Sequence, residues 1–121
     1  MTDPTTGPTT GPTPHVTDVA HAELEDWGPL AEATGPGMTT RGIERWVDGQ
    51  LSGGIWECTP GPSYWVQDEH EVIHLVAGRM TVTPDGGEPT ELGAGDMAVF
   101  PKGWSGTWDI HETVRKVYAI F

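Results

Sequence analysis

Residues 71–103 read EVIHLVAGRMTVTPDGGEPTELGAGDMAVFPKG, and this stretch decides the fold. Runs rich in Val, Ile and Thr are separated in it by clusters of Gly, Pro and Asp, which is the pattern of short strands joined by tight turns. The Asp-Gly step in residues 84–87 supplies the positive φ that a hairpin turn needs, and residues 93–96 and 101–103 mark two further turns. The stretch therefore predicts strands near 71–76, 79–83, 89–92 and 96–100.

The same pattern of short apolar runs separated by turn residues continues on both sides of this stretch, from residue 42 to residue 121. It predicts further strands near 42–47, 53–58, 63–67, 105–109 and 113–120. Helical periodicity follows none of these strands, so alternating strands and helices around a parallel sheet are not expected. Many short strands at a spacing of about 8–12 residues are instead typical of an all-β barrel or sandwich.

The first part of the chain differs from the rest in composition. Residues 1–14 contain TTGPT twice and no aliphatic side chain after Met1, so we expect a disordered or extended arm. Residues 15–41 form an N-terminal extension, in which one short helical turn is expected around 20–27 before the break at Gly28-Pro29. Residues 42–121 then make up the one barrel domain that a chain of 121 residues can hold.

Acidic residues outnumber basic ones 18 to 6, which gives a formal net charge of −12. Such a chain is not expected to bind nucleic acid, whose phosphates need Lys and Arg, or an anionic membrane surface. The sequence has no run of about 18 apolar residues, and its start lacks the basic and apolar regions of a signal peptide. We therefore expect a cytoplasmic protein. Its single cysteine, Cys58, cannot form an internal disulfide.

Two motifs within residues 71–103 carry a resemblance to a known family. In the first, Glu71 is followed by six residues and then Gly78; in the second, Gly95 is followed by five residues and then Pro101-Lys102-Gly103. On these motifs residues 42–121 resemble the cupins, which implies a double-stranded β-helix (jelly-roll) barrel. The segments GIWECTPGPSYW and FPKGWSGTWDIHETVRKVY are most similar to small single-domain cupins related to the cupin domains of (S)-ureidoglycine aminohydrolase.

The resemblance also locates the family's metal ligands. Metal-binding cupins carry His-x-His before the motif Glu and a further His after the second motif. Here the shorter spacing puts the first pair at Trp65 and Gln67, the longer spacing puts it at Tyr64 and Val66, and the last position is Gly106. Only Glu71 is retained, with Gln67 as a weak oxygen donor. Because a transition metal needs about three or four N, O or S ligands, we expect no resident metal and no other cofactor.

Residues 70–74 read His-Glu-Val-Ile-His, which matches the H-E-x-x-H string of zinc metalloproteases. That chemistry requires both histidines one turn apart on a helix. The β-branched Val72 and Ile73 favour a strand, on which His70 and His74 lie about 13 Å apart. We therefore expect no zinc site here.

Side chains alternate between the two faces of a strand, so Glu71, Ile73 and Leu75 are expected to share one face. Glu71 is the candidate catalytic residue, since a carboxyl among indoles suits general acid or base chemistry. By the same alternation His74 faces the other side, as a core or interface residue, whereas the facing of Arg45, Trp56 and Tyr118 stays open. Cys58 has no basic neighbour in sequence and is expected to be an inert core residue. The candidate substrate-binding residues are Trp56, Trp65, Gln67, Ile73, Trp104, Trp108 and Tyr118.

These residues lead to a function hypothesis with several alternatives. The first is a metal-independent enzyme of the isomerase, dehydratase or cyclase type, acting on an apolar or planar organic molecule in an aromatic-lined cavity. The second is a non-catalytic barrel that binds a small ligand. The third is a metal-dependent hydrolase that resembles (S)-ureidoglycine aminohydrolase. A fourth is a purely structural dimer unit; a homodimer is expected in any case, because pairing hides strand edges.

Overall fold

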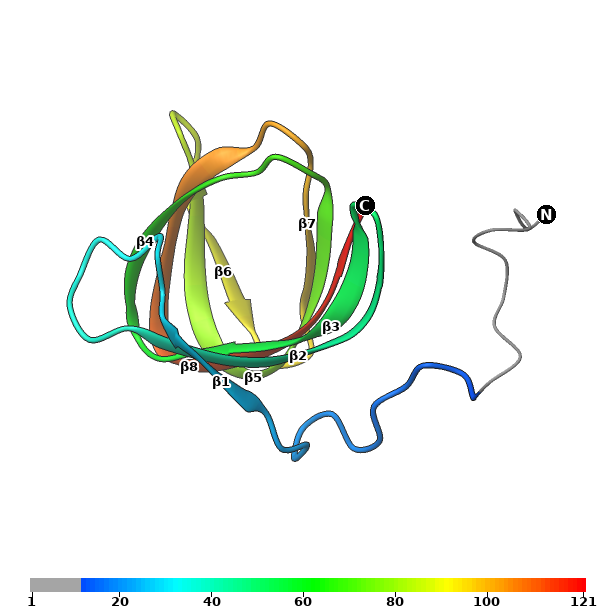
Figure 1. Cartoon of the computed structure of the whole chain (residues 1–121). Coiled ribbons are helices and arrows are strands. Elements are labelled where there is room, and N and C mark those ends of the chain that lie inside the picture. Colours follow the sequence, from blue (N-terminus) through cyan, green and yellow to red (C-terminus); the bar gives the residue numbers. More distant parts are fainter. Residues whose placement is uncertain (1–11) are drawn as a thin grey trace.

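Eight antiparallel strands make up the part of the chain that the computed structural model describes, residues 12–121 (Figure 1). The all-β barrel predicted from the sequence is confirmed. The strands are β1 (Glu25–Pro29), β2 (Thr39–Asp48), β3 (Leu51–Cys58), β4 (Gly61–Val66), β5 (Glu71–Pro84), β6 (Thr90–Gly93), β7 (Met97–Phe100) and β8 (Ser105–Ile120). The predicted arm, residues 1–14, lies almost wholly outside the described residues.

The two longest strands, β5 and β8, form the spine of the barrel and pair with each other along most of their length (Figure 1). The first half of β5 also pairs with β7, and its second half pairs with β6. In the same way β8 pairs with β4 through its first half and with β3 through its second half. Because each long strand changes its outer partner midway, the sheet curls around a common interior and closes into a jelly roll.

The sequence predicted breaks at the middle of both long strands, and this prediction is wrong. β5 runs through residues 77 and 78, and β8 runs through residues 110–112. The register between them shifts at several points from Leu75 to Met80, so the chain bends by β-bulges instead of leaving the sheet. Gly78 lies at this bend with φ +87°, and a Cβ there would lie 2.2 Å from the Thr113 carbonyl oxygen. The motif glycine therefore allows the two strands to cross closely.

The helical turn expected around residues 20–27 is also not found. A turn at residues 18–21 is closed by the His21 amide, which donates to the Asp18 carbonyl, and residues 25–29 then form strand β1. β1 pairs with β2, and the Trp27 ring lies against Gly42, where no side chain stands in the way. Tertiary pairing thus overrides the weak local helical preference of this segment.

The N-terminal extension is held against the outside of the barrel by one buried arginine. Arg115 of β8 points outward, yet only 7% of it is exposed. Its guanidinium donates to the carbonyls of Val19 and Ala22 at 2.9 and 3.0 Å, and to the Glu57 carboxylate at 3.0 Å. These bonds compensate the desolvation of the charge and fix residues 19–22 on the outer sheet face.

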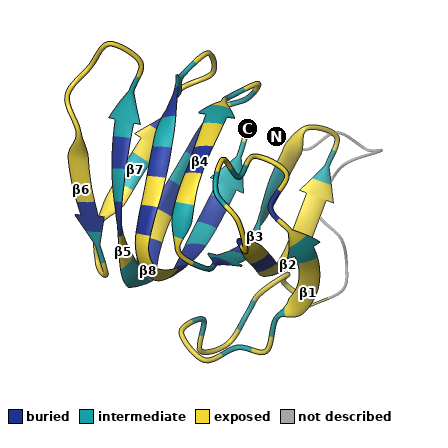
Figure 2. Ribbon diagram, turned by 90° about the vertical axis from the view of Figure 1, so that its left-hand side faces the viewer, coloured by how far each residue is buried: buried dark blue, intermediate teal, exposed yellow. Residues whose placement is uncertain are grey.

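Inward side chains of β5, β7 and β8 form most of the core, together with Leu30, Met38, Cys58 and Leu92. Buried residues alternate with more exposed ones along much of these strands (Figure 2). The predicted alternation is confirmed on β5, where Glu71, Ile73 and Leu75 are all buried. His74, between the last two, is exposed on the outer side. Residues 12–121 include no helix with the length and apolar character of a membrane span.

Candidate functional site

A cavity of about 230 Å³ opens into the barrel between β1, β2, β3, β4, β5 and β8. Its walls combine four aromatic rings and one isoleucine with five polar or charged side chains. This combination of an apolar lining with a few polar groups is that of a small-molecule site. The lining residues are Trp27, Glu44, Ser52, Trp56, Trp65, Gln67, Glu71, Lys116, Tyr118 and Ile120.

A buried ion pair joins the cavity wall to the core. The Lys116 ammonium of β8 donates to Glu71 Oε2 at 2.7 Å, and the Gln67 amide donates to Glu71 Oε1 at 3.3 Å. Glu71 is 6% exposed and Lys116 is 4% exposed. The carboxylate is therefore matched in charge and bonded on both oxygens, although both residues still line the cavity.

The other sides of the Lys116 ammonium face aromatic rings. Its Nζ lies 4.5 Å from the centroid of Trp56, 4.6 Å from that of Trp108 and 5.9 Å from that of Tyr118. The strand register places it there, because Lys116 is the cross-strand partner of Trp56 on β3 and of Leu75 on β5. Ring faces carry negative electrostatic potential, so they stabilise a cation that has lost its water.

Three tryptophans beneath the ion pair form one packed cluster. Trp65 stacks on Trp108 with their centroids 4.5 Å apart, and Trp56 meets both rings edge-on at 6.1 Å. The Trp65 indole donates to Ser63 Oγ at 2.8 Å, and that hydroxyl in turn donates to the Trp108 carbonyl at 3.2 Å. The cluster thus gives the cavity rigid walls whose ring orientations are set by packing and hydrogen bonds.

The structure brings together most of the side chains predicted to form the site. Trp56, Trp65, Gln67, Glu71 and Tyr118 all line the cavity. Three predicted substrate-binding residues lie elsewhere: Ile73 is in the core, Trp108 is fully buried behind Trp65, and Trp104 packs against Phe100 at 5.0 Å.

Five lining residues were missed from the sequence: Trp27, Glu44, Ser52, Lys116 and Ile120. A signal for Lys116 was present, because it lies two residues before Tyr118 on the same strand and so shares its face. No local pattern identifies Trp27, since it reaches the cavity only through the pairing of β1 with β2. Arg45, whose facing was open, lines a different cavity on the outer face.

The residues at the family's metal positions do not fit a metal ion. The cavity contains Trp65 and Gln67, the pair given by the shorter spacing, while Tyr64 and Val66 are exposed. Gly106 pairs with Trp65, and a Cβ at Gly106 would lie 2.2 Å from the Thr83 carbonyl oxygen, so a larger ligand residue has no room there. Residues 12–121 also hold no group of three or more His, Cys, Asp or Glu side chains suited to a metal. The Lys116 ammonium occupies one oxygen of the remaining candidate, Glu71.

The H-E-x-x-H string lies at the start of a strand, as predicted. Its Glu71 points into the barrel and His74 points out, while the His70 ring accepts from the Lys102 amide at 3.0 Å. The three side chains therefore have different surroundings and form no common site.

Burial shifts the acidity of two groups in and near the site. Desolvation raises the pKa of Tyr118 to about 12, with smaller contributions in the same direction from Glu44 and Glu71. Tyr118 is therefore a neutral phenol at neutral pH. Desolvation also raises the pKa of the Cys58 thiol to about 11, although the nearby Lys116 opposes this shift.

We expect Cys58 to resist alkylation in the folded protein. Because the thiolate is the reactive form, a buried thiol with a pKa of about 11 reacts with iodoacetamide at pH 8 at least about 100-fold more slowly than the same thiol in urea. Mass spectrometry of labelled protein in buffer and in urea measures the ratio. Equal labelling rates in both solutions would show that the thiol is accessible and ionised in the fold.

The comparisons with known proteins agree on the fold. The chain is similar to a protein of unknown function of the DUF861 family from Pseudomonas syringae pv. tomato, at 24% identity over 84% of this chain, with a TM-score of 0.76. It spans only 45% of the length of that protein. It is similar to the EutQ protein of Clostridium difficile at 15% identity over 86% of this chain and 83% of that one, with a TM-score of 0.72.

A third solved structure is more similar in sequence over a shorter region. It is a DUF861 family protein from Thermotoga maritima, 34% identical over 55% of this chain and 76% of that one, with a TM-score of 0.54. No curated protein matches the chain. The family model of the EutQ-like cupin domain matches residues 47–118, which is more than half of the sequence. The predicted cupin fold is thereby confirmed, and the chain belongs to the EutQ-like cupin family.

Proposed function

We propose that this chain binds a small planar organic molecule in the 230 Å³ cavity and that Glu71 exchanges a proton with it, without a resident metal. The observation that carries the proposal is the buried Glu71–Lys116 ion pair in the wall of an aromatic cavity. A hydrophobic pair of similar volume generally stabilises a barrel as well as a buried ion pair does. The pair therefore suggests a role in chemistry rather than in folding.

Glu71 is the group able to exchange a proton with a ligand. A carboxylate has about four acceptor positions, and Lys116 and Gln67 occupy one on each oxygen. The remaining positions can accept a proton from the ligand. In an isomerisation Glu71 takes a proton from one ligand atom and returns it to another, so the step needs no nucleophile, oxidant or leaving group. Lys116 is a positioning residue that fixes the carboxylate and balances its charge.

The lining also indicates which ligands fit. Glu44 places a second carboxylate in the wall, and Trp27, Trp56 and Trp65 supply aromatic surface. Carboxylates and ring faces both attract N–H donors and positive charge. A cavity of 230 Å³ lies below the usual range of drug-sized sites. The proposed ligand is therefore small, planar, and neutral or cationic, with at least one N–H or O–H donor.

The predicted likeness to the cupin domains of (S)-ureidoglycine aminohydrolase does not enter this proposal. A metal-dependent hydrolase of that kind needs ligands that Trp65, Gln67 and Gly106 do not supply. A non-catalytic binding barrel is the second candidate, because both oxygens of Glu71 are already bonded and can serve recognition alone.

Deuterium exchange tests the proposed proton transfer. Small aromatic α-amino ketones combine a planar ring, an ammonium donor and an acidic C–H, and NMR follows their C–H signal in D₂O. We expect the wild-type protein to accelerate exchange and Glu71→Gln to lower that acceleration at least about 100-fold while the ligand still binds. Glu44→Gln is the matched control: it removes the other cavity carboxylate, so it should weaken binding of the ammonium group but keep exchange at saturating ligand, because Glu71 remains.

Ligand binding is measured separately, as the increase in the protein's thermal stability when the ligand is added. A ligand at about 100 times its dissociation constant adds about 2.7 kcal/mol to the free energy of unfolding. Benzylamine is the cationic probe without an acidic ketone C–H, and benzoate is its anionic counterpart. Stabilisation by the amino ketones without exchange in the wild type would establish the binding barrel in place of the enzyme. Exchange that survives Glu71→Gln would remove Glu71 from the chemistry.

A further inference from the structure

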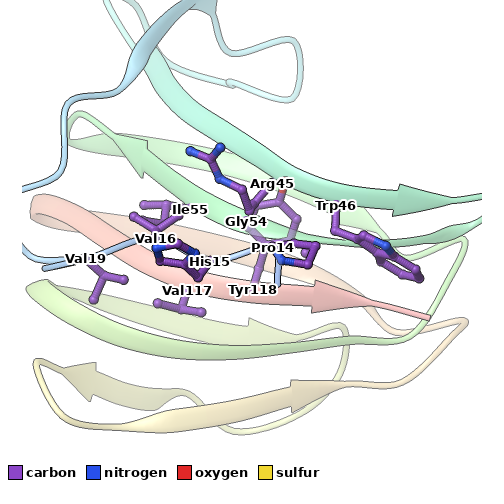
Figure 3. A pocket seen from close by; sticks show the side chains of 11 residues that line it. Pro14, His15, Val16, Val19, Arg45, Trp46, Gly54, Ile55, Val117 and Tyr118 are labelled. Atoms are coloured by element: carbon purple, nitrogen blue, oxygen red, sulfur yellow. The ribbon is translucent and has the colours of Figure 1, made fainter. Parts of the chain in front are cut away.

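A second cavity, of about 280 Å³, lies on the outside of the barrel beside the N-terminal extension (Figure 3). We call it the outer cavity. Neighbouring residues of β8 line different cavities, Lys116 the one around Glu71 and Val117 the outer one, so the sheet lies between the two. Among residues 12–121 only Tyr118 lines both. The outer cavity is therefore separate from the proposed proton-transfer site.

Aliphatic side chains form much of the surface of the outer cavity. Val16 and Val19 come from the N-terminal extension, and Ile55 and Val117 come from β3 and β8 (Figure 3). The extension is held in place there, because the Arg115 guanidinium donates to the Val19 carbonyl at 2.9 Å. The cavity is thus formed in the folded chain itself, and its walls suit a hydrocarbon group.

A β-bulge places a cation beside these walls. Glu44 of β2 pairs with Gly54 of β3, and Trp46 pairs with the adjacent Gly53, so one residue of β2 has no partner between them. That residue is Arg45. Neighbours on a regular strand face opposite sides of the sheet, whereas Arg45 and Trp46 both line the outer cavity (Figure 3). Bulges redirect side chains in this way, often next to functional sites.

The charge of Arg45 is not matched by the chain. Of the six basic side chains, four form ion pairs with carboxylates, and Arg45 forms none with any of residues 12–121. The residues that line the outer cavity include no acid, although the chain has 18 acidic residues. A guanidinium binds a carboxylate through two parallel hydrogen bonds. The outer cavity is therefore complementary to a molecule with an apolar body and one anionic end.

We propose that the outer cavity binds a small aliphatic carboxylic acid. Its carboxylate lies on the Arg45 guanidinium and its hydrocarbon chain lies among the valines and Ile55. A volume of about 280 Å³ is at the lower end of small-molecule sites and suits a ligand of about ten non-hydrogen atoms. The site does not depend on proton transfer by Glu71 and takes a ligand of the opposite charge.

Calorimetric titration of the full chain with octanoate tests the proposal. We expect one octanoate per chain with a dissociation constant below about 1 mM, the affinity that a ligand of this size reaches. Arg45→Gln removes the charge and should raise the dissociation constant at least about 10-fold. Arg79→Gln is the matched control, because it removes the charge of another exposed arginine, on β5 and outside the cavity, and should leave the affinity unchanged.

A cavity-filling variant tests the location. A Cβ at Gly53 would meet only the Tyr118 carbonyl oxygen, at 3.5 Å, which is an ordinary contact. Gly53→Val should therefore keep the fold, fill part of the outer cavity and weaken octanoate binding at least about 10-fold. Arg45→Gln changes an exposed side chain, so the test does not depend on the folding of Gly53→Val.

Four results would overturn the proposal. The first is a wild-type protein that does not bind octanoate at 10 times the expected dissociation constant. The second is binding that is unchanged in both Arg45→Gln and Gly53→Val, which would place octanoate elsewhere. The third is an equal loss in Arg79→Gln, which would show an effect of net charge alone. The fourth is tighter binding in Glu71→Gln, which frees the Lys116 ammonium and would place octanoate in the cavity inside the barrel.

Discussion

Lys116→Met is expected to lower the free energy of unfolding by about 3–5 kcal/mol, because it leaves the buried Glu71 carboxylate without its cation. Met fills a volume similar to the lysine stem and still packs on Trp56 and Trp108, so the loss reports the charge and not a cavity. Urea denaturation of the wild type and the variant measures the difference.

The double variant Glu71→Leu, Lys116→Met separates the two possible sources of this loss. Removing both charges leaves an apolar pair, which should recover most of the lost stability. If the double variant is as unstable as Lys116→Met, the lysine stem matters for packing and the ion pair does not. A cost below about 1 kcal/mol in the single variant would mean that water solvates Glu71 from the cavity.

Gly78→Ala is expected to cost about 3–5 kcal/mol. Positive φ strains any residue with a side chain, and the new methyl group would also lie 2.2 Å from the Thr113 carbonyl oxygen at the bend of β5. Because that oxygen belongs to β8, relief of the clash has to separate the two strands that hold the barrel together. Thermal unfolding followed by circular dichroism measures the loss.

Gly86→Ala is the matched control for this substitution. Gly86 has a comparable φ of +72° in the turn after β5, but nothing lies within 4 Å of the Cβ that would be added. It therefore reports conformational strain alone, with an expected cost of about 1–2 kcal/mol. Equal costs at the two positions would show that β8 moves away freely and that the close approach at Gly78 stabilises nothing.

The buried lysine gives the motif glutamate a different partner from the metal ion that it binds in metal-binding cupins. In metal-binding cupins the glutamate at this motif position is a metal ligand. In this chain Glu71 instead accepts a hydrogen bond from the Lys116 ammonium at 2.7 Å. The cation is thus part of the chain, and the aromatic rings around it take the place of water. The chemistry available is that of a positioned carboxylate in an aromatic cavity.

Local sequence was sufficient to predict most of the strands, the turns and the cupin family, but not β1 or the continuity of β5 and β8. Period-two alternation and Gly, Pro and Asp punctuation are short-range signals, and they predicted the strands around residues 71–103 and the inward facing of Glu71. The motif spacing from Glu71 to Gly78 and from Gly95 to Gly103 predicted the cupin fold. The same alternation placed His74 on the outside of the barrel.

Only the tertiary structure decided which side chains meet. Lys116 reaches Glu71 because β5 and β8 pair over a separation of 45 residues, and no local pattern encodes that register. Trp27 enters the cavity wall through the pairing of β1 with β2, while Trp108 is withdrawn behind Trp65 by ring packing. Strand periodicity is a property of the local backbone and can be read from sequence. Partners across a sheet depend on loop closure and on bulges such as the one at Gly78, which the folded barrel alone determines.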